Sequence, residues 1–488
     1  MIEPGLRGAL HVSGCTSDAG KSTIVVGLCR LLARNGVSVA PFKAQNMALN
    51  SFVTRSGDEI GRAQGVQALA AGLDPTPAMN PILLKPTTDR ASQVVVMGQP
   101  IGVMTAAEYH DHKPALLDLV LGALAELRST YDVVLCEGAG SPTEINLLAH
   151  DIVNLRLAAE SGMRAVVVGD IDRGGVFAHL YGTVALLPAD LRATVGGFLI
   201  NCFRGDPALL GDGTAQLEAA CGVPTLGVIP MIDGLWLDGE DSVALGRPIP
   251  SAGPPLADPL EVVAIRLPRL SNYTDLDALA LEPGVSVRYV ADAASVGRPD
   301  LVVIPGSKET VSDLAWLRSQ GIDAAIAASG ADVLGICAGY QMLGGSITDD
   351  VESFAGTVSG LGLLGGVTTT FGPDKVLRQH EGERASGYQI HHGRVSGPAD
   401  GGWVPLDDGD EGTVRADGRV RGTTLHGLFE HDAFRTQFLI ELAERRAKRF
   451  APAGIVFADA RTARFDAIAD ALETHLDLEA LAALITTT

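Results

Sequence analysis

Residues 12–22 read VSGCTSDAGKS, and this stretch decides the fold of the first half of the chain. An apolar run typical of a buried strand precedes it at residues 9–13, and the helical pattern TIVVGLCRLLARNG follows it. Glycines between a strand and a helix let backbone amides face phosphate oxygens, and the helix N-terminus adds partial positive charge. We therefore predict a P-loop that binds a nucleotide, with Mg²⁺ on the hydroxyl of Ser22. The predicted nucleotide contacts in this loop are Gly14, Gly20, Lys21 and Ser22.

The loop has the spacing Gly-x5-Gly-Lys-Ser, which is one residue longer than the standard P-loop. Dethiobiotin synthetase and its relatives share that longer spacing, and EGAG at residues 137–140 also resembles their sequence. A carboxylate at the carboxyl end of a strand lies beside the nucleotide in such sheets, so we expect Glu137 to complete the metal site. Glu59, in GDEIGRAQ, is a second candidate metal ligand, and the alternative for it is a surface carboxylate.

Polar residues also follow other predicted strands. Asp170 and Asp172, in VVVGDIDRGG, either hold substrate or a second Mg²⁺, or form a turn and cap a helix. Asn201 ends a strand at the place where related enzymes recognise adenine. Lys43 contacts the γ-phosphate or a substrate carboxylate, unless it is simply a solvated lysine. We include Lys43 and Asn201 among the predicted nucleotide-binding residues.

Short apolar runs alternate with longer helical patterns along the chain, which predicts an α/β architecture with a doubly wound parallel sheet. In the first half the expected strands are residues 9–13, 37–42, 132–136, 165–169, 197–200 and 225–229. In the second half they are residues 262–267, 285–290, 301–304 and 333–336. The sequence therefore predicts two α/β domains.

Five prolines in PIPSAGPPLADP, residues 248–259, cannot continue a helix or a central strand. We therefore place a domain boundary there. The predicted parts are a nucleotide-binding domain (1–247), a Pro-rich linker (248–260), a second α/β domain (261–440) and a C-terminal helical extension (441–488) with a packing role.

Residues 335–339 read GICAG, after the strand-like ADVLGI and before a helical run. Cys337 is therefore expected in a sharp strand-to-helix turn, which the two glycines permit. Such a turn exposes the thiol at a helix N-terminus, where the reactive thiolate is favoured. A lone buried cysteine is ordinarily inert, but the other five cysteines lack this setting. Cys337 is the predicted nucleophile.

An acyl-transfer cysteine needs a base and an oxyanion hole. His426, in GTTLHGLFEHD, is the expected base, and the backbone N–H groups of Gly306 and Ala338 are the expected oxyanion hole. This set resembles class I glutamine amidotransferases, except that Leu428 stands where their acidic partner follows the histidine. The prediction is accordingly a Cys337–His426 dyad.

Other residues near these motifs have less defined roles. Whether Glu430 orients the imidazole is left open. His391 and His392, in SGYQIHHG, are expected to line the path of glutamine or ammonia, and His431 is a further candidate for the base.

Composition excludes several classes of partner. The net charge is −21, and no stretch concentrates Lys and Arg, so we expect no nucleic-acid partner. The six cysteines form no CxxC pair, which favours a reducing, cytoplasmic location. No signal peptide and no uncharged span of membrane length is recognisable, so no membrane partner is expected. The sequence leaves open whether the protein is a homo-oligomer.

Segments from residue 12 to about residue 434 resemble the cobyric acid synthase family of vitamin B12 biosynthesis. They are APFKAQNMALNS, EIGRAQ, MNPILLKP, CEGAGSPTEINL, DIDRGGVFAHL, NCFRGD, LPRLSNYTDLDAL, IPGSKET, GICAGYQMLGG and GYQIHHG. In this family a dethiobiotin synthetase-like synthetase domain is fused to a class I glutamine amidotransferase-like domain without the third triad member, in agreement with Leu428.

The resemblance implies a glutamine-dependent amidoligase. ATP and Mg²⁺ would activate corrinoid carboxylates as acyl phosphates, and ammonia that Cys337 releases from L-glutamine would displace the phosphate. Amides would form at positions b, d, e and g of adenosylcobyrinic acid a,c-diamide.

Three other functions share some of these features. The a,c-diamide synthase of the same pathway shares both chemistries, but QNMALNS and DIDRGGVFA favour the b, d, e, g enzyme. A MinD-type ATPase would carry a signature lysine early in the loop, where Cys15 and Thr16 stand, and a basic tail. A non-catalytic glutamine sensor would not need Cys337, His426 and Lys21.

Overall fold

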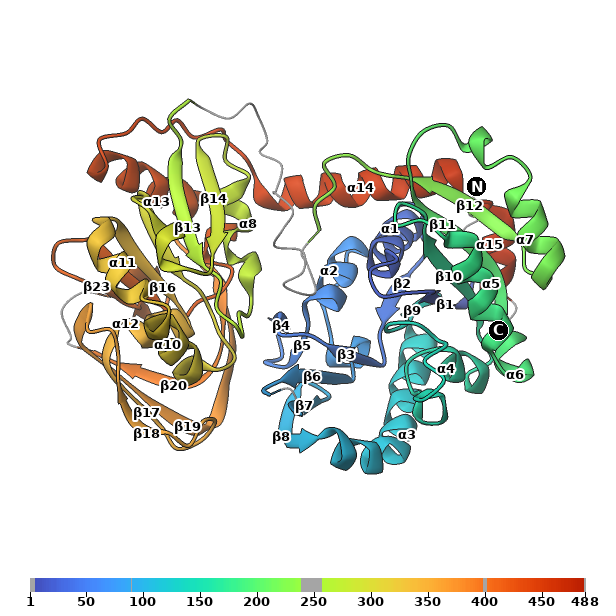
Figure 1. The fold of residues 1–488 in the computed structure, drawn as a ribbon, viewed down its shortest axis with the longest axis horizontal. Coiled ribbons are helices and arrows are strands. Elements are labelled where there is room, and N and C mark those ends of the chain that lie inside the picture. Colours follow the sequence, from blue (N-terminus) through green and yellow to red (C-terminus); the bar gives the residue numbers. More distant parts are fainter. Residues whose placement is uncertain (1–4, 89, 238–256, 398–401, 487–488) are drawn as a thin grey trace. The chain divides into compact units, whose positions relative to one another are not determined.

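The computed structural model describes residues 5–88, 90–237, 257–397 and 402–486, which form two compact units (Figure 1). Unit 1 comprises residues 1–48, 58–238 and 461–488. Unit 2 comprises residues 49–57 and 239–460.

A six-stranded sheet, parallel throughout, forms the centre of unit 1 in the order β12-β11-β10-β1-β9-β2. Its strands are β1 (Gly8–Gly14), β2 (Val39–Phe42), β9 (Val133–Glu137), β10 (Arg164–Asp170), β11 (Val195–Phe203) and β12 (Thr225–Pro230). Each strand predicted for the first half is present. Strand β1 lies in the middle of the sheet, so the loop that follows it opens at the sheet's carboxyl edge.

Both faces of this sheet are buried, which explains the continuous apolar runs of its strands. In β9, Val133 and Leu135 belong to the core that includes helix α1 (Lys21–Arg34). Val134 and Cys136 point to the opposite face and share a core with helix α3 (Ala106–Thr130). The predicted doubly wound α/β arrangement is confirmed.

Further elements of unit 1 surround this sheet. The helices are α2 (Arg62–Ala70), α4 (Leu155–Glu160), α5 (Val176–Leu186), α6 (Ala189–Arg192) and α7 (Gly213–Cys221). A small separate sheet has the order β3-β6-β7-β8, with β3 (Gln45–Met47), β6 (Ile82–Pro86), β7 (Ala91–Val96) and β8 (Gln99–Thr105). The short strand β5 (Glu59–Gly61) precedes α2.

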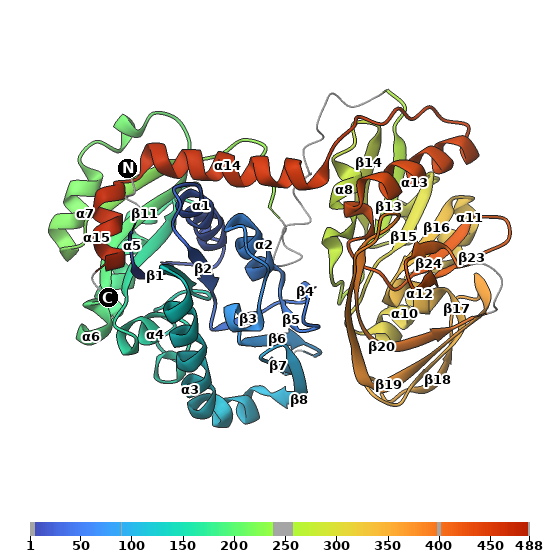
Figure 2. The ribbon, with the colours of Figure 1, turned by 180° about the vertical axis from the view of Figure 1, so that it is seen from behind.

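The C-terminal helices belong to the core of unit 1, although they are last in the sequence. Residues of α14 (Phe457–His475) and α15 (Leu478–Thr486) pack against α1, as Figure 2 shows from behind. Fully buried Leu472 is one of these contacts, and Arg30 forms an ion pair of 2.7 Å with Asp466. These two helices therefore pack on α1, the helix that follows the P-loop, and this contact is compatible with the packing role predicted for the C-terminal extension.

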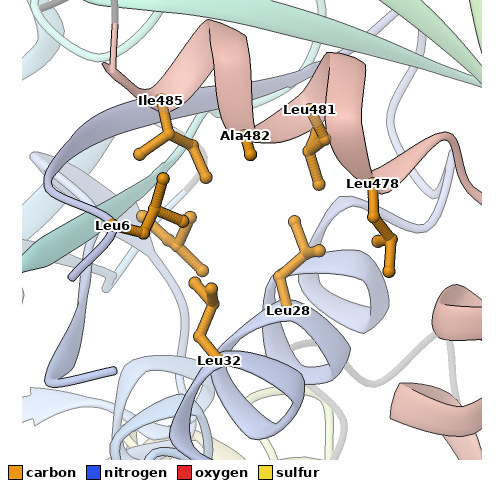
Figure 3. A pocket seen from close by; sticks show the side chains of 8 residues that line it. Leu6, Leu28, Leu32, Leu478, Leu481, Ala482 and Ile485 are labelled. Atoms are coloured by element: carbon orange, nitrogen blue, oxygen red, sulfur yellow. The ribbon is translucent and has the colours of Figure 1, made fainter. Parts of the chain in front are cut away.

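A cavity of about 10 Å³ remains between α1 and α15, near β1 (Figure 3). Only aliphatic side chains line it: Leu6, Leu28, Leu32, Leu135, Leu478, Leu481, Ala482 and Ile485. A space of this size holds about one water molecule, and the lining offers no polar partner, so we interpret it as a packing defect.

Unit 2 has a second six-stranded sheet, ordered β14-β13-β15-β16-β24-β23 and parallel except for the β23–β24 pair. Its strands are β13 (Leu260–Ile265), β14 (Val285–Val290), β15 (Leu301–Ile304), β16 (Asp332–Ile336), β23 (Thr413–Val414) and β24 (Val420–Thr423). The four strands predicted for the second half are all present. Its helices are α8 (Asp277–Ala280), α9 (Ala293–Val296), α10 (Thr310–Ser319), α11 (Ile322–Ser329), α12 (Ala338–Leu343) and α13 (Asp432–Arg445).

A four-stranded sheet, β18-β17-β19-β20, forms a separate layer of unit 2, seen in orange in Figure 2. It contains β17 (Gly344–Asp349), β18 (Gly356–Ser359), β19 (Leu364–His380) and β20 (Gly387–Ser396). None of the strands of this layer was predicted from the sequence. The remaining strands of the unit are β4 (Ser51–Val53), β21 (Val404–Leu406) and β22 (Gly409–Glu411).

The predicted domain limits remain a proposal. Residues 248–256 of the predicted linker lie outside the described residues. Two segments group by packing rather than by their place in the sequence: residues 49–57 with unit 2, and residues 461–488 with unit 1. Helix α13 also runs through residue 440, where the second domain was expected to end.

Candidate active sites

Glu137 is the point at which polar side chains converge beside the predicted P-loop. Its Oε1 accepts hydrogen bonds from Ser22 Oγ at 2.8 Å and from Lys43 Nζ at 3.0 Å, and its Oε2 accepts one from Gln67. Burial raises the pKa of Glu137, but Lys43 and these hydrogen bonds outweigh burial and hold the pKa below its ordinary value. The structure thus brings an ionised carboxylate together with Ser22 at the carboxyl end of β9. Gln67 was missed in the sequence, because nothing marks its amide as different from any other helical glutamine.

Lys21 lies across the loop at the start of α1. Its Nζ donates to the backbone oxygens of Thr16 and Gly140, both at 3.1 Å. Gly20, just before it, has φ of 95°, a left-handed conformation that favours glycine. The side chain of Lys21 is therefore held over the loop by carbonyl groups from both the P-loop and the EGAG segment.

Asn201, on β11, contacts the loop itself. Its Nδ2 donates to Ala19 O at 3.1 Å, and a Cβ on Gly20 would lie 2.1 Å from the same nitrogen. The structure thus brings Asn201 to the end of the P-loop. The expected contact with adenine stays a prediction.

Glu59 is completely buried and pairs with Lys85 Nζ at 2.6 Å. Because burial requires this charge to be paired, metal binding by Glu59 would require the ion pair to open. The alternative of a surface carboxylate was wrong, and the metal role stays a prediction.

Asp170 and Asp172 form a turn at the end of β10. Asp170 Oδ1 accepts the backbone N–H of Asp172 at 2.8 Å, and its Oδ2 lies 3.2 Å from Arg173 Nε. Asp172 Oδ1 accepts from Arg204 Nε at 2.7 Å. These contacts agree with the turn-forming interpretation, while binding of substrate or a second Mg²⁺ is still a prediction.

In unit 2, Cys337 occupies the sharp turn between β16 and α12. Its φ is 52° and ψ is −109°, a conformation rarely adopted by residues other than glycine. The flanking residues must be glycines because a side chain at either position would clash with the backbone. A Cβ on Gly335 would lie 2.6 Å from Tyr340 N, and one on Gly339 would lie 1.8 Å from Ile304 O. The local geometry is that of a nucleophile elbow.

His426 is buried next to Cys337. Its backbone exchanges two hydrogen bonds with Tyr388, of 2.9 and 2.8 Å, and the two rings are stacked with centroids 5.5 Å apart. Burial lowers the pKa of His426, but Asp275 and the Cys337 side chain raise it more, to about 10. The imidazole is therefore protonated at neutral pH in this arrangement.

Asp275 is the acidic partner of His426, and it was not predicted from the sequence. It belongs to the short 3-10 helix η5 (Tyr273–Leu276). Its Oδ2 lies 2.7 Å from His426 Nδ1, and its Oδ1 accepts the backbone N–H of Gly427 at 2.8 Å. The predicted dyad is thus extended by a carboxylate. Leu428, at the usual acidic position, packs in an apolar cluster with Leu425.

The residues predicted to form the oxyanion hole both lie next to this site, and their role stays a prediction. Ala338 is the first residue of α12, directly after Cys337. A Cβ on Gly306 would lie 2.9 Å from His426 Cε1 and 3.0 Å from Ser271 O, so only glycine fits there. Gly306 belongs to the loop after β15, and Ala338 belongs to the elbow. The two segments are in close contact where Gly339 lies against Ile304 O.

Known protein families match both units. Residues 10–241 match the CobQ/CobB/MinD/ParA nucleotide binding domain, and residues 261–434 match the CobB/CobQ-like glutamine amidotransferase domain. The chain is 54% identical to a cobyric acid synthase of Rhodococcus jostii, over 99% of this chain and 97% of that protein. The identity is 53% to one of Mycolicibacterium paratuberculosis (98% and 97% covered) and 50% to one of Nocardia farcinica (99% and 97% covered).

The chain belongs to the cobyric acid synthase family. As a member of this family it is a glutamine-dependent amidoligase with a P-loop nucleotide-binding domain. Ser22 and Glu137 lie within the first matched domain, and Cys337 and His426 lie within the second. None of the helices in the described part of the chain has the length and apolar character needed to cross a membrane.

The other histidines of this cobyric acid synthase family member differ in their surroundings. His431 accepts the backbone N–H of Phe434 at 3.2 Å and so caps α13, which occupies the nitrogen that a base would need. His392 Nδ1 contacts Gly372 O at 3.1 Å. Burial lowers the pKa of His391 to about 4, and this effect outweighs that of the backbone of Gly393, which raises it. A lining role for His391 and His392 stays a prediction.

Proposed function

We propose that this protein amidates the b, d, e and g carboxylates of adenosylcobyrinic acid a,c-diamide, with ATP as the energy source and glutamine as the nitrogen donor. The similarity to cobyric acid synthases along nearly the whole chain supports the corrinoid substrate. The observation that carries the proposal is the presence of two sites in one chain. In unit 2, Asp275 contacts His426 beside Cys337. In unit 1, Ser22 contacts Glu137.

The nucleotide site fits ATP with Mg²⁺. Mg²⁺ prefers oxygen ligands and usually keeps phosphate and water oxygens in its other positions, and Ser22 Oγ and Glu137 Oε1 offer two oxygens 2.8 Å apart. Bound there, Mg²⁺ would neutralise charge on the phosphate oxygens. Lys21 exchanges its bonds to Thr16 O and Gly140 O for phosphate oxygens, while Lys43 contacts the γ-phosphate or the substrate carboxylate.

Activation of the acceptor follows from elementary chemistry. A carboxylate is a poor electrophile, so one of its oxygens attacks the γ-phosphorus of ATP, and ADP leaves. The resulting acyl phosphate has a good leaving group. Ammonia attacks the acyl carbon, phosphate departs, and loss of a proton gives the amide. Ammonia must be produced by the enzyme, because bulk ammonium at neutral pH is not a nucleophile.

Unit 2 would supply that ammonia. The Cys337 thiolate attacks the amide carbon of glutamine, and the N–H groups of Gly306 and Ala338 stabilise the oxyanion. The His426 imidazolium donates its proton to the leaving nitrogen, so ammonia departs and a thioester remains. His426 then takes a proton from water, which hydrolyses the thioester to glutamate. Asp275 fixes the orientation of the imidazole and stabilises its positive charge.

The expected setting is the cytoplasm, where ATP, glutamine and a reducing environment coexist. The free cysteines among the described residues agree with such a compartment.

The test is mass spectrometry of the corrinoid after incubation with protein, ATP, Mg²⁺ and glutamine. We expect adenosylcobyrinic acid a,c-diamide to show four successive acid-to-amide steps. Cobyrinic acid without the a and c amides is the matched control substrate. Amidation of that control at a and c alone would assign the a,c-diamide activity instead, and glutamine hydrolysis without any corrinoid product would mean that the acceptor is another carboxylic acid.

A further inference from the structure

Residues 49–57, here called the 49–57 segment, lie early in the chain but pack within unit 2. The segment contains strand β4, and its Val53 is fully buried in a small apolar cluster with Tyr388 and Ile390. The ring of Phe52 lies 5.8 Å from that of Tyr388, and Gln379 Nε2 donates to Val53 O at 2.5 Å. The segment is therefore an integral part of the unit that carries Cys337.

The backbone of Ser51 connects two groups that hold His426. Its N–H donates to Asn272 Oδ1 at 2.9 Å, and its carbonyl oxygen accepts from Tyr388 Oη at 3.1 Å. Tyr388 stacks on the His426 ring and shares two backbone hydrogen bonds with it. Asn272 directly precedes η5, which carries Asp275.

The position of Asn272 makes this connection stiff. It has a φ of 51°, and its carbonyl oxygen accepts the backbone N–H of Asp275 at 3.2 Å. A shift of Ser51 would therefore act on the imidazole in two ways: through the carboxylate that orients it and through the ring stacked on it.

The segment is continuous in the chain with the nucleotide site of unit 1. Lys43, which precedes it, donates to Glu137, the same carboxylate that accepts the Ser22 hydroxyl. Glu59, which follows it, is held by Lys85. The chain is thus held by a buried ion pair on each side of the segment, and each pair includes a carboxylate that was predicted to bind the metal of the nucleotide.

We propose that the 49–57 segment is a positioning element for His426, through which nucleotide binding at Ser22 and Glu137 raises the rate of glutamine hydrolysis. The inference rests on the proposed function of the two sites. When a nucleotide binds, Lys43 and Glu137 exchange part of their mutual contact for phosphate and metal, and Ser51 carries the change to Asn272 and Tyr388. Glutamine is then hydrolysed mainly when an acceptor can be activated.

The experiment measures glutamate release by the full-length protein, with and without Mg²⁺ and the non-hydrolysable analogue β,γ-imido-ATP. In the wild type we expect the analogue to raise kcat about 5- to 150-fold, the usual range of allosteric coupling, with little change in KM for glutamine. Tyr388→Phe removes the hydroxyl that contacts Ser51 but keeps the stacked ring. Asn272→Gly removes the side-chain acceptor and tolerates the positive φ.

Both variants are expected to lose most of the stimulation, so that kcat with the analogue approaches kcat without it. Tyr289→Phe is the matched control, because it removes a tyrosine hydroxyl bonded to the backbone of η5, at Tyr273 O, from outside the segment. It should keep the wild-type stimulation.

Two results would overturn the inference. One is a wild-type enzyme that makes amide from glutamine but hydrolyses glutamine equally fast with and without the analogue, which would leave the proposed function intact. The other is an equal loss of kcat with and without the analogue in Tyr388→Phe and Asn272→Gly, which a merely structural role predicts. A wild-type protein that releases no glutamate under any condition would instead contradict the proposed function.

Discussion

Replacement of Asp275 by Asn tests the extended catalytic arrangement directly. Asp275 accepts two N–H donors, from His426 Nδ1 at 2.7 Å and from Gly427 N at 2.8 Å. Asparagine has one acceptor oxygen, so its NH₂ group must face one of these donors. The variant therefore loses at least one of the two hydrogen bonds and the negative charge that stabilises the imidazolium.

A hydrogen bond to a charged group contributes about 1.5–3 kcal/mol, which corresponds to a loss of about 10- to 150-fold in kcat for glutamine hydrolysis. The pH profile should change as well. The raised pKa of His426, about 10, predicts that the wild-type rate declines at alkaline pH only as the pH approaches 10. Without the Asp275 charge the pKa falls, so the alkaline limb should move down by about one to two pH units.

The raised pKa of His426 also makes the stability of the folded state depend on pH. Protonated His426 stabilises the folded state fully below pH 6.5, the ordinary pKa of histidine, and this contribution is lost as the pH rises toward about 10. Asp275→Asn should therefore lower the thermal unfolding temperature most below pH 6.5, progressively less as the pH rises, and least above pH 10.

The assay is glutamate release from glutamine between pH 6 and 11, with ammonia-driven amidation as the check that the protein is folded. Asp277→Asn is a matched control, since Asp277 is a buried carboxylate of the same stretch that begins α8. It should keep the wild-type alkaline limb. Full activity of Asp275→Asn with an unchanged alkaline limb would refute the assigned role of Asp275.

Three further outcomes are expected. Glu137→Gln removes the charge that pairs with Lys43. It should abolish amidation with either nitrogen source, while glutamine hydrolysis remains measurable. An unchanged Mg²⁺ dependence of the variant would contradict a metal role for Glu137. Gly339→Ala places a Cβ 1.8 Å from Ile304 O. The variant should therefore lose glutamine hydrolysis and unfold at a lower temperature. A wild-type rate of glutamine hydrolysis would mean that the backbone of the elbow can shift to make room for the methyl group. Leu472→Ala deletes a fully buried side chain from the core of α1 and should cost about 2–5 kcal/mol in denaturant unfolding; no loss would mean that α14 does not stabilise unit 1.

The parts that the sequence predicted depend on local patterns. An apolar run buried on both faces identifies a strand such as β9 without knowledge of its neighbours, and the spacing of glycines around Lys21 and Cys337 identifies the turns that follow β1 and β16. Adjacent positions in one turn need no tertiary information. For this reason the two sheets and the two loops could be read from the chain.

The parts that the sequence missed depend on distant contacts. Asp275 precedes His426 by 151 residues, and the segment LSNYTDLDAL was noted for its resemblance to the family without a role for its acidic residues. The absence of an acidic residue at Leu428 was itself the available signal, since a buried histidine base needs a partner from elsewhere. The 49–57 segment gave no such signal, because its packing against Tyr388 is set by tertiary structure alone.

The measurement that tests the central claim most directly compares glutamine and ammonia as nitrogen sources in two variants. Amide formation on the corrinoid is followed with amide-¹⁵N-labelled glutamine, or with ammonium chloride at alkaline pH, for the wild type, Cys337→Ala and Lys21→Ala. We predict that Cys337→Ala loses glutamine-driven synthesis but keeps ammonia-driven synthesis, and that Lys21→Ala loses both. Transfer of ¹⁵N from glutamine by Cys337→Ala at the wild-type rate would contradict the assignment of the nucleophile and, with it, the division of the reaction between the two sites.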